Sequence, residues 1–165
     1  MIDGLEIHPS IVHFPIALTI VGALAVLAYA LLRRDWLRWF GPILLTIALA
    51  GAGGAYFSGK SAEDRAEHIG VPEAAIEEHE EVAIWAIWVI GLSALLAWAT
   101  HASRRGVWLA GIVSLAAVTL VALAAHRGGK LVYIHGAGHV PSASAPKAGA
   151  SPAGATGGAP AADTH

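Results

Sequence analysis

Four long apolar segments that carry no charged side chain decide what this chain can fold into. They cover residues 11–32, 39–57, 82–100 and 107–126. Each has roughly the 20 residues that an α-helix needs to cross the hydrocarbon core of a bilayer. Charged residues make up 13% of the chain, against about 25% in a soluble domain. The sequence therefore predicts an all-α protein, a four-helix transmembrane bundle formed by residues 1–140.

The last part of the chain has a different composition. Residues 141–165 consist mostly of Ala, Gly, Pro and Ser. Such a segment cannot bury enough apolar surface to offset the entropy lost on folding. We expect it to form a disordered tail.

The distribution of arginine predicts the orientation of the bundle. The first and third connections carry Arg33, Arg34, Arg38, Arg104 and Arg105, whereas the middle connection is acidic. The positive-inside rule places arginine-rich connections in the cytoplasm. Both termini would then lie outside, on the periplasmic or extracellular face of the cytoplasmic (inner) membrane. The first segment has acidic residues before it and arginines after it, the reverse of a cleaved signal peptide, so we expect it to be retained.

Proline and glycine indicate where the helices begin and end. Pro15 and Pro42 fit the first turns of the first and second helices, where a missing N–H matters little. Gly128 and Gly129 are expected to end the fourth helix. A short amphipathic helix from about Pro72 is expected to lead into the third.

Most of the histidines fall at the end of the bundle that carries both termini. Of the nine in the chain, these are His8, His13, His68, His79, His126, His135 and His139. A histidine in or beside a bilayer core usually faces protein, water, a cofactor or a partner. The chain has no cysteine, which excludes cysteine-ligated zinc, iron–sulfur clusters and thiol catalysis. This pattern favours a metal or haem site.

Small residues share helical faces with two of these histidines. The stripe of His79 contains Ala83, Ala86, Ser93 and Ala97, and that of His126 contains Ala122, Thr119 and Gly111. Membrane helices approach one another along such stripes, so both histidines are expected to point into the bundle. The stripe of His13 is only partly small. In the second helix, Gly54 lies between Ala50 and Ser58, and the missing side chain is expected to permit close helix packing or to leave room for a flat ligand.

Two sequence motifs resemble those of a known family. Residues 8–15 read HPSIVHFP, and residues 128–138 read GGKLVYIHGAG. They resemble the HPxxVHFP and GGxLVYxHGxG motifs of DUF2231, a family of predicted bacterial membrane proteins. The resemblance covers about residues 5–140 and implies a four-helix membrane domain without implying an established activity. His139 departs from the family pattern.

Both motifs are predicted to meet at the outer face, where Gly136 and Gly138 permit a tight turn. We expect one cluster of cofactor ligands, formed by His13, His79, His126 and His135. For a metal ion, His8 and His139 join the candidate ligands. Neutral imidazole binds haem iron, copper and zinc. Hydrogen bonding alone is an equally open role for these side chains.

Three functions follow from this pattern. The first is a haem b or metal-binding subunit that transfers electrons, with the acidic middle connection docking a basic soluble electron carrier. The second is a non-catalytic structural or assembly subunit of an oligomer or a larger membrane complex. The third is a copper- or zinc-handling protein. No hydrolase or nucleotide-binding motif is present, and a net charge of −2 gives no basic surface for nucleic acid.

Overall fold

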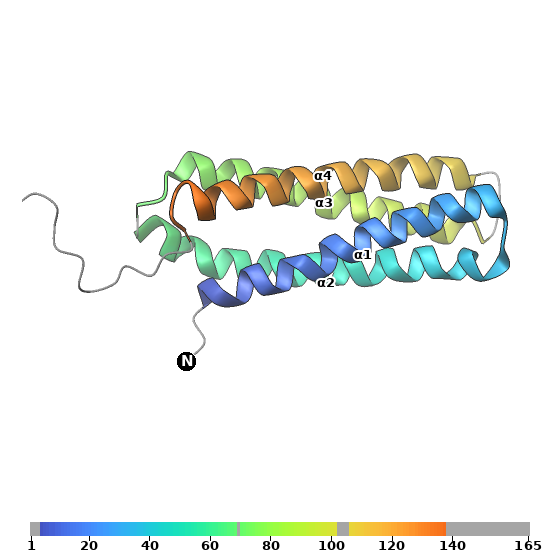
Figure 1. Ribbon diagram of the computed structural model, residues 1–165, viewed down its shortest axis with the longest axis horizontal. Helices are drawn as coiled ribbons and strands as arrows, with labels where there is room; N and C mark the ends of the chain where they lie inside the picture. The colour runs from blue at the N-terminus through green and yellow to red at the C-terminus, as the bar shows by residue number, and fades with distance from the viewer. Residues whose placement is uncertain (1–3, 69, 102–105, 138–165) are drawn as a thin grey trace, which may run out of the picture.

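The chain folds into four long helices, seen in Figure 1 as two antiparallel pairs. The computed structural model describes residues 4–68, 70–101 and 106–137. Helix α1 spans Gly4–Leu32, α2 spans Asp35–His68, α3 spans Glu73–Ala99 and α4 spans Val107–Tyr133. All four are long and apolar enough to cross a membrane. The predicted all-α, four-helix membrane architecture is confirmed.

The helices form a ring: α1 contacts α2, α2 contacts α3, α3 contacts α4, and α4 contacts α1. The most extensive packing joins α1 to α2 and α3 to α4. Because successive helices run in opposite directions, α1 and α3 begin where α2 and α4 finish (Figure 1, left). We call this the histidine end. The opposite end carries the connections from Leu32 to Asp35 and from Ala99 to Val107, and we call it the arginine end.

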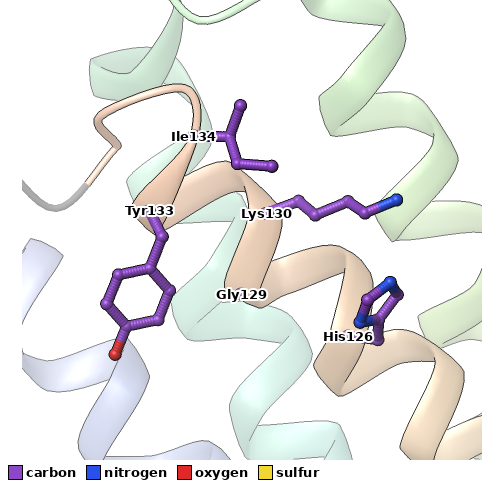
Figure 2. A pocket seen from close by; sticks show the side chains of 5 residues that line it. All are labelled: His126, Gly129, Lys130, Tyr133 and Ile134. Carbon is purple, nitrogen blue, oxygen red and sulfur yellow. The ribbon is translucent and has the colours of Figure 1, made fainter.

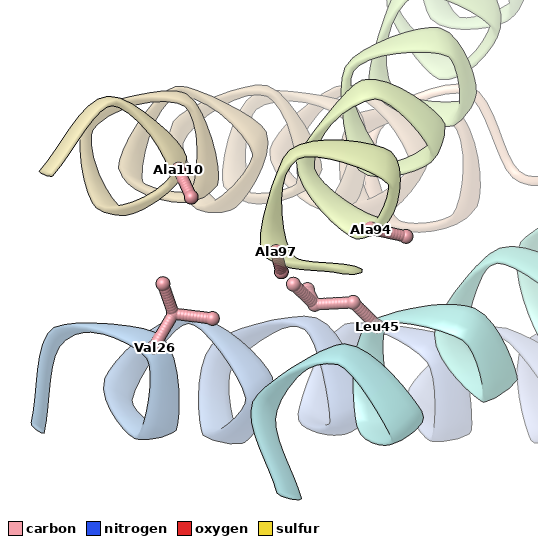
Figure 3. Close-up of a cluster of buried hydrophobic side chains, with 5 residues drawn as sticks. All are labelled: Val26, Leu45, Ala94, Ala97 and Ala110. Carbon is pink, nitrogen blue, oxygen red and sulfur yellow. The ribbon is translucent and has the colours of Figure 1, made fainter. Parts of the chain in front are cut away.

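Small side chains fill the interior, and large apolar side chains cover the outside. Figure 3 shows one buried cluster, to which all four helices contribute; it contains Val26, Leu45, Ala94, Ala97 and Ala110. By contrast, Phe57 is 72% exposed and Trp88 is 70% exposed. Lipid tails are as apolar as leucine, so membrane helices associate chiefly through close packing of small residues. Small side chains inside and large apolar side chains outside are therefore the arrangement expected of helices that pack together in a bilayer.

Glycine permits the closest contact between α1 and α2. A Cβ atom on Gly41 would lie 2.7 Å from Cγ2 of Val26 and 3.1 Å from the backbone nitrogen of that residue. Gly51 packs against Pro15 less tightly, because a Cβ there would lie 3.4 Å from the proline ring, at ordinary contact distance. The expectation of close packing at Gly54 is wrong, because this residue is exposed and a Cβ there would meet nothing within 4 Å. The close-packed face of α2 is therefore the one that carries Gly41 and Gly51.

The helices are longer than the sequence predicts. Helix α2 continues to His68 and α3 begins at Glu73, so most of the acidic middle segment is helical. The short helix expected from about Pro72 is the first part of α3. Gly70 turns the chain between them with a φ of +89°, a conformation that glycine adopts without strain.

Both prolines expected in first turns lie further inside their helices. Pro15 follows eleven residues of α1 that begin at Gly4, and Pro42 lies inside α2, which begins at Asp35. A proline in a helix interior cannot donate to the carbonyl four residues earlier. The carbonyl oxygens of both prolines accept hydrogen bonds from threonine hydroxyls, at 2.7 Å from Thr19 and 2.8 Å from Thr46.

Helix α4 also continues past its expected end. It includes Gly128 and Gly129 and ends only at Tyr133. Glycine weakens an isolated helix by about 1 kcal/mol relative to alanine, but packing against a neighbouring helix overrides this preference here. A Cβ on Gly128 would lie 3.1 Å from the imidazole of His79. The missing side chain thus makes room for a histidine of α3. The expected tail falls outside the described residues.

We predict that Gly41→Ala destabilises the protein by about 1–3 kcal/mol, because the new methyl group would press on the side chain and backbone of Val26. Gly54→Ala is the matched control on the same helix. It should leave stability unchanged or raise it slightly, because alanine is the better helix former. Unfolding in mild detergent measures both effects. Equal melting of the two variants would contradict the packing of α1 on α2 described above.

Candidate functional site

At the histidine end, the side chain of His79 joins α3 to α4. Its Nδ1 lies 3.1 Å from the carbonyl oxygen of Ala124. Since a carbonyl only accepts hydrogen bonds, Nδ1 carries the proton and donates. The ring lies over Gly128, where no side chain intervenes. His79 is half-buried, and its predicted inward orientation is confirmed.

A second hydrogen bond joins the same two helices, with the donor side chain on α4 and the acceptor backbone on α3. Arg127 on α4 donates from Nη1 to the carbonyl oxygen of Glu78 on α3, at 2.7 Å. Each helix therefore supplies one side chain that bonds to the backbone of the other. We call His79, Ala124, Arg127 and Glu78 the α3–α4 clamp. Arg127 belongs to none of the motifs or small-residue stripes in the sequence.

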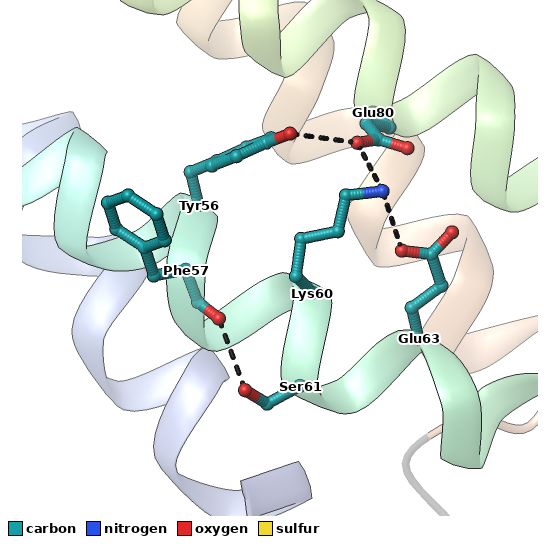
Figure 4. A network of polar contacts seen from close by, with 6 residues as sticks. All are labelled: Tyr56, Phe57, Lys60, Ser61, Glu63 and Glu80. Atoms are coloured by element: carbon teal, nitrogen blue, oxygen red, sulfur yellow. Dashed lines mark hydrogen bonds and ion pairs between the residues drawn. The ribbon is translucent and has the colours of Figure 1, made fainter.

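Charged and polar side chains join α2 to α3 at the same end (Figure 4). The Nζ atom of Lys60 lies 2.7 Å from Oε1 of Glu80 and 2.9 Å from Oε2 of Glu63. The hydroxyl of Tyr56 donates to Oε1 of Glu80 at 3.3 Å. Exposed ion pairs usually contribute less than about 1 kcal/mol, so this network aligns the two helices more than it stabilises them.

His126 does not point into the bundle, contrary to expectation. It is exposed and borders a shallow hollow of about 280 Å³ on the surface of α4. Figure 2 shows the other lining residues of the hollow, which are Gly129, Lys130, Tyr133 and Ile134. Ala124 and Gly128 face α3, and each is two residues from His126. Two residues correspond to about 200° around a helix, which carries this side chain to the opposite face.

Two further candidate ligands differ from the half-buried His79 in their exposure. His13 and His135 are both exposed. His135 follows α4 in a turn where Gly136 has a φ of +75°, and the N–H of Ala137 closes the turn by donating to the carbonyl of Leu131 at 2.9 Å. The predicted tight turn at Gly136 is confirmed.

Within the described residues, no three His, Cys, Asp or Glu side chains come together in a way that could hold a metal ion. The backbone of His8 lies in α1, but its side chain falls outside the description, and so does all of His139. The expected cluster of four ligands is not assembled in this part of the chain. Ligation by two histidines stays a prediction, as does any contribution of His8 or His139.

A second histidine contact, which the sequence analysis missed, lies at the arginine end. Nε2 of His101 donates to the carbonyl oxygen of Arg38 at 2.9 Å, and Nη2 of Arg38 donates to the carbonyl oxygen of His101 at 2.6 Å. Because Pro42 has no N–H, the carbonyl of Arg38 lacks the donor that an α-helix normally supplies from four residues further on. The imidazole supplies this donor. In the sequence, the only sign of this contact is Pro42, which shows that the carbonyl of Arg38 needs a donor from elsewhere.

Two tryptophans surround this contact and extend it. The ring centroid of His101 lies 4.2 Å from that of Trp39 and 5.3 Å from that of Trp98. Nε1 of Trp98 also donates to the hydroxyl of Thr46 at 3.0 Å, and this hydroxyl donates to the carbonyl of Pro42. We call Arg38, Trp39, Thr46, Trp98 and His101 the α2–α3 joint. Its contacts bring the end of α3 onto the first turns of α2.

Comparison with curated proteins gives no match, and comparison with solved structures gives none either. Comparison with protein families gives one that covers the whole helical bundle. Residues 4–141 match the family described as predicted membrane protein, DUF2231. This range includes all four helices, the α3–α4 clamp and the turn at Gly136. The protein is therefore an integral membrane protein that belongs to the DUF2231 family.

Proposed function

We propose that this protein is a non-catalytic structural or assembly subunit of a larger membrane complex. The observation that carries the proposal is the α3–α4 clamp. His79 is the half-buried member of the predicted ligand set, and its Nδ1–H bonds to a backbone carbonyl of α4. Hydrogen bonds between membrane helices contribute on the order of 0.5–1.5 kcal/mol each. In this role the histidine stabilises a scaffold and takes no part in a reaction.

The positions of the other histidines support the same role. His13, His126 and His135 are exposed, and no group of three metal-binding side chains forms among the described residues. The α2–α3 joint uses His101 in the same manner as the clamp uses His79, through a hydrogen bond to a backbone carbonyl. Imidazoles at both ends of the bundle thus act as connectors between helices.

The acidic surface at the histidine end is the part of the scaffold that would meet a partner. Its exposed carboxylates belong to Glu67, Glu73, Glu77, Glu78 and Glu81. A surface of one charge attracts partners of the opposite charge, and this attraction weakens with salt. A basic subunit or a basic soluble electron carrier fits this surface. Other membrane helices would pack against the apolar sides of the bundle.

A second candidate function is electron transfer through haem b, or the binding of copper or zinc. One observation favours it. A histidine that donates from Nδ1 to a backbone carbonyl keeps the lone pair of Nε2 for a metal, which is how metal-bound histidines are commonly oriented. His79 has this arrangement, and His13, His126 or His135 would supply a second ligand. This function requires a helix movement or a second copy that brings another imidazole to His79.

We also propose that the bundle lies in the cytoplasmic (inner) membrane with its arginine end facing the cytoplasm. The connections at that end contain Arg33, Arg34, Arg104 and Arg105, and arginine-rich connections are retained on the cytoplasmic side. The histidine end and both termini would then face the periplasm or the exterior.

Substitutions of His79 separate the structural role from metal ligation. The amide of asparagine can donate a hydrogen bond from nearly the position of Nδ1, but it has no counterpart of Nε2. We predict that His79→Asn keeps most of the stability, whereas His79→Ala loses about 0.5–1.5 kcal/mol in detergent unfolding. Purified protein should show no Soret band and no stoichiometric copper or zinc.

Blue native electrophoresis of gently solubilised membranes tests the assembly role directly. The wild-type protein and His79→Asn should both migrate above the purified 17.0 kDa chain in the same detergent. A haem spectrum or bound metal that both substitutions abolish would instead establish the second candidate function. Migration of the wild-type protein as the isolated chain would rule out a larger complex.

Reporter fusions test the orientation. A periplasm-active reporter should be active after Glu73 and after residue 137, and inactive after Asp35, because the arginines hold their connections in the cytoplasm. Replacing Arg33 and Arg34 with glutamine is expected to reduce this asymmetry. An active reporter at Asp35 in the wild-type protein would reverse the proposed orientation.

A further inference from the structure

The hollow beside His126 has the features of a small binding site. It occupies about 280 Å³ over the last two turns of α4. In Figure 2, Lys130 and His126 extend to one side of Gly129, while Tyr133 extends to the other. A Cβ on Gly129 would meet nothing within 4 Å. No helix occupies the space above this glycine, so the missing side chain leaves the hollow open at the surface.

The position of the hollow along α4 determines which molecules reach it. The uncharged stretch of this helix ends at His126, and Lys130 lies one turn beyond it. At 1.5 Å per residue, the hollow spans about 10 Å at the edge of the hydrocarbon core. Lysine and tyrosine are typical of this depth, where lipid headgroups begin. Below the hollow, the exposed Thr119, Ala122 and Leu123 leave an apolar path that an acyl chain can follow.

The positive charge of Lys130 is available to pair with an anion. The histidine end has two described lysines with contrasting surroundings. Lys60 is paired with Glu63 and Glu80, whereas Lys130 is exposed and forms no ion pair with any described residue. His126 extends to the same side of Gly129 as Lys130 and adds a hydrogen-bond donor there (Figure 2). These groups are complementary to a phosphate.

We propose that this hollow binds the headgroup phosphate of a phospholipid in the leaflet at the histidine end, with a preference for anionic lipid. The ammonium of Lys130 pairs with the phosphate, to which His126 donates from the same side of Gly129. Tyr133 lines the opposite side of the hollow. One acyl chain follows the exposed side of α4. The choline of a zwitterionic lipid would bring a second positive charge near Lys130, which is why anionic lipid is preferred.

Native mass spectrometry of the full chain in mild detergent, titrated with phosphatidylglycerol or phosphatidylcholine, tests the proposal. Lys130→Gln should weaken phosphatidylglycerol binding about fivefold, the factor expected for one basic residue at a membrane surface. Lys130→Arg should bind as the wild-type protein does. Lys60→Gln is the matched control, because it removes a lysine from the same end whose charge is already paired, and its binding should stay within about twofold of the wild type.

Three results would overturn the proposal. They are unchanged phosphatidylglycerol binding by Lys130→Gln, equal binding of the two lipids, and equally tight binding of inorganic phosphate alone, which would identify a site for free phosphate. Melting of each variant without added lipid shows whether it is folded. A loss of binding in Lys130→Gln therefore counts only alongside an unchanged melting temperature and normal binding by Lys130→Arg.

Discussion

Close approach of the helix backbones is the interaction on which the rest of this structure depends. Inside a bilayer, apolar side chains gain little by leaving lipid for protein, so attraction between helices comes from dense packing and from hydrogen bonds. The interior consists largely of alanine, and Gly41 brings α2 against the backbone of Val26. Most of the bulky side chains lie on the outside, and Tyr29, Leu45 and Ile90 are the largest that are fully buried.

Close packing also explains how the polar groups are used. Ser93 and Ser114 are fully buried, and each hydroxyl donates to a carbonyl four residues earlier in its own helix at 2.7 Å. Among the described residues, longer polar side chains form hydrogen bonds between helices near the ends of the bundle. His79 and Arg127 do so at one end, and His101 and Arg38 do so at the other. In each case the acceptor is a backbone carbonyl, so the contact fixes the helices themselves.

The sequence was sufficient to predict the helices, because long uncharged segments have few alternatives in a membrane. It also predicted that His79 faces inward, since a stripe of small residues marks the packed face. The same reasoning failed for His126 and Gly54, because small residues occur on several faces of these alanine-rich helices and no single face stands out. The helix ends were misplaced where packing overrides local preference, as at Gly128 beneath the ring of His79. The contact between Arg38 and His101 depends on residues 63 positions apart, and such a pairing emerges only from the fold.

The two histidine contacts differ in when they can form. The α3–α4 clamp lies within one helical hairpin, so it can form as soon as that hairpin has entered the membrane. The α2–α3 joint connects the first hairpin to the second, because Arg38 lies in α2 and His101 follows α3. It can form only after both hairpins have been inserted and have met. Until then, the carbonyl of Arg38 has neither the donor that Pro42 lacks nor the imidazole of His101. The hydrogen bond that this carbonyl gains from His101 therefore favours association of the two inserted hairpins.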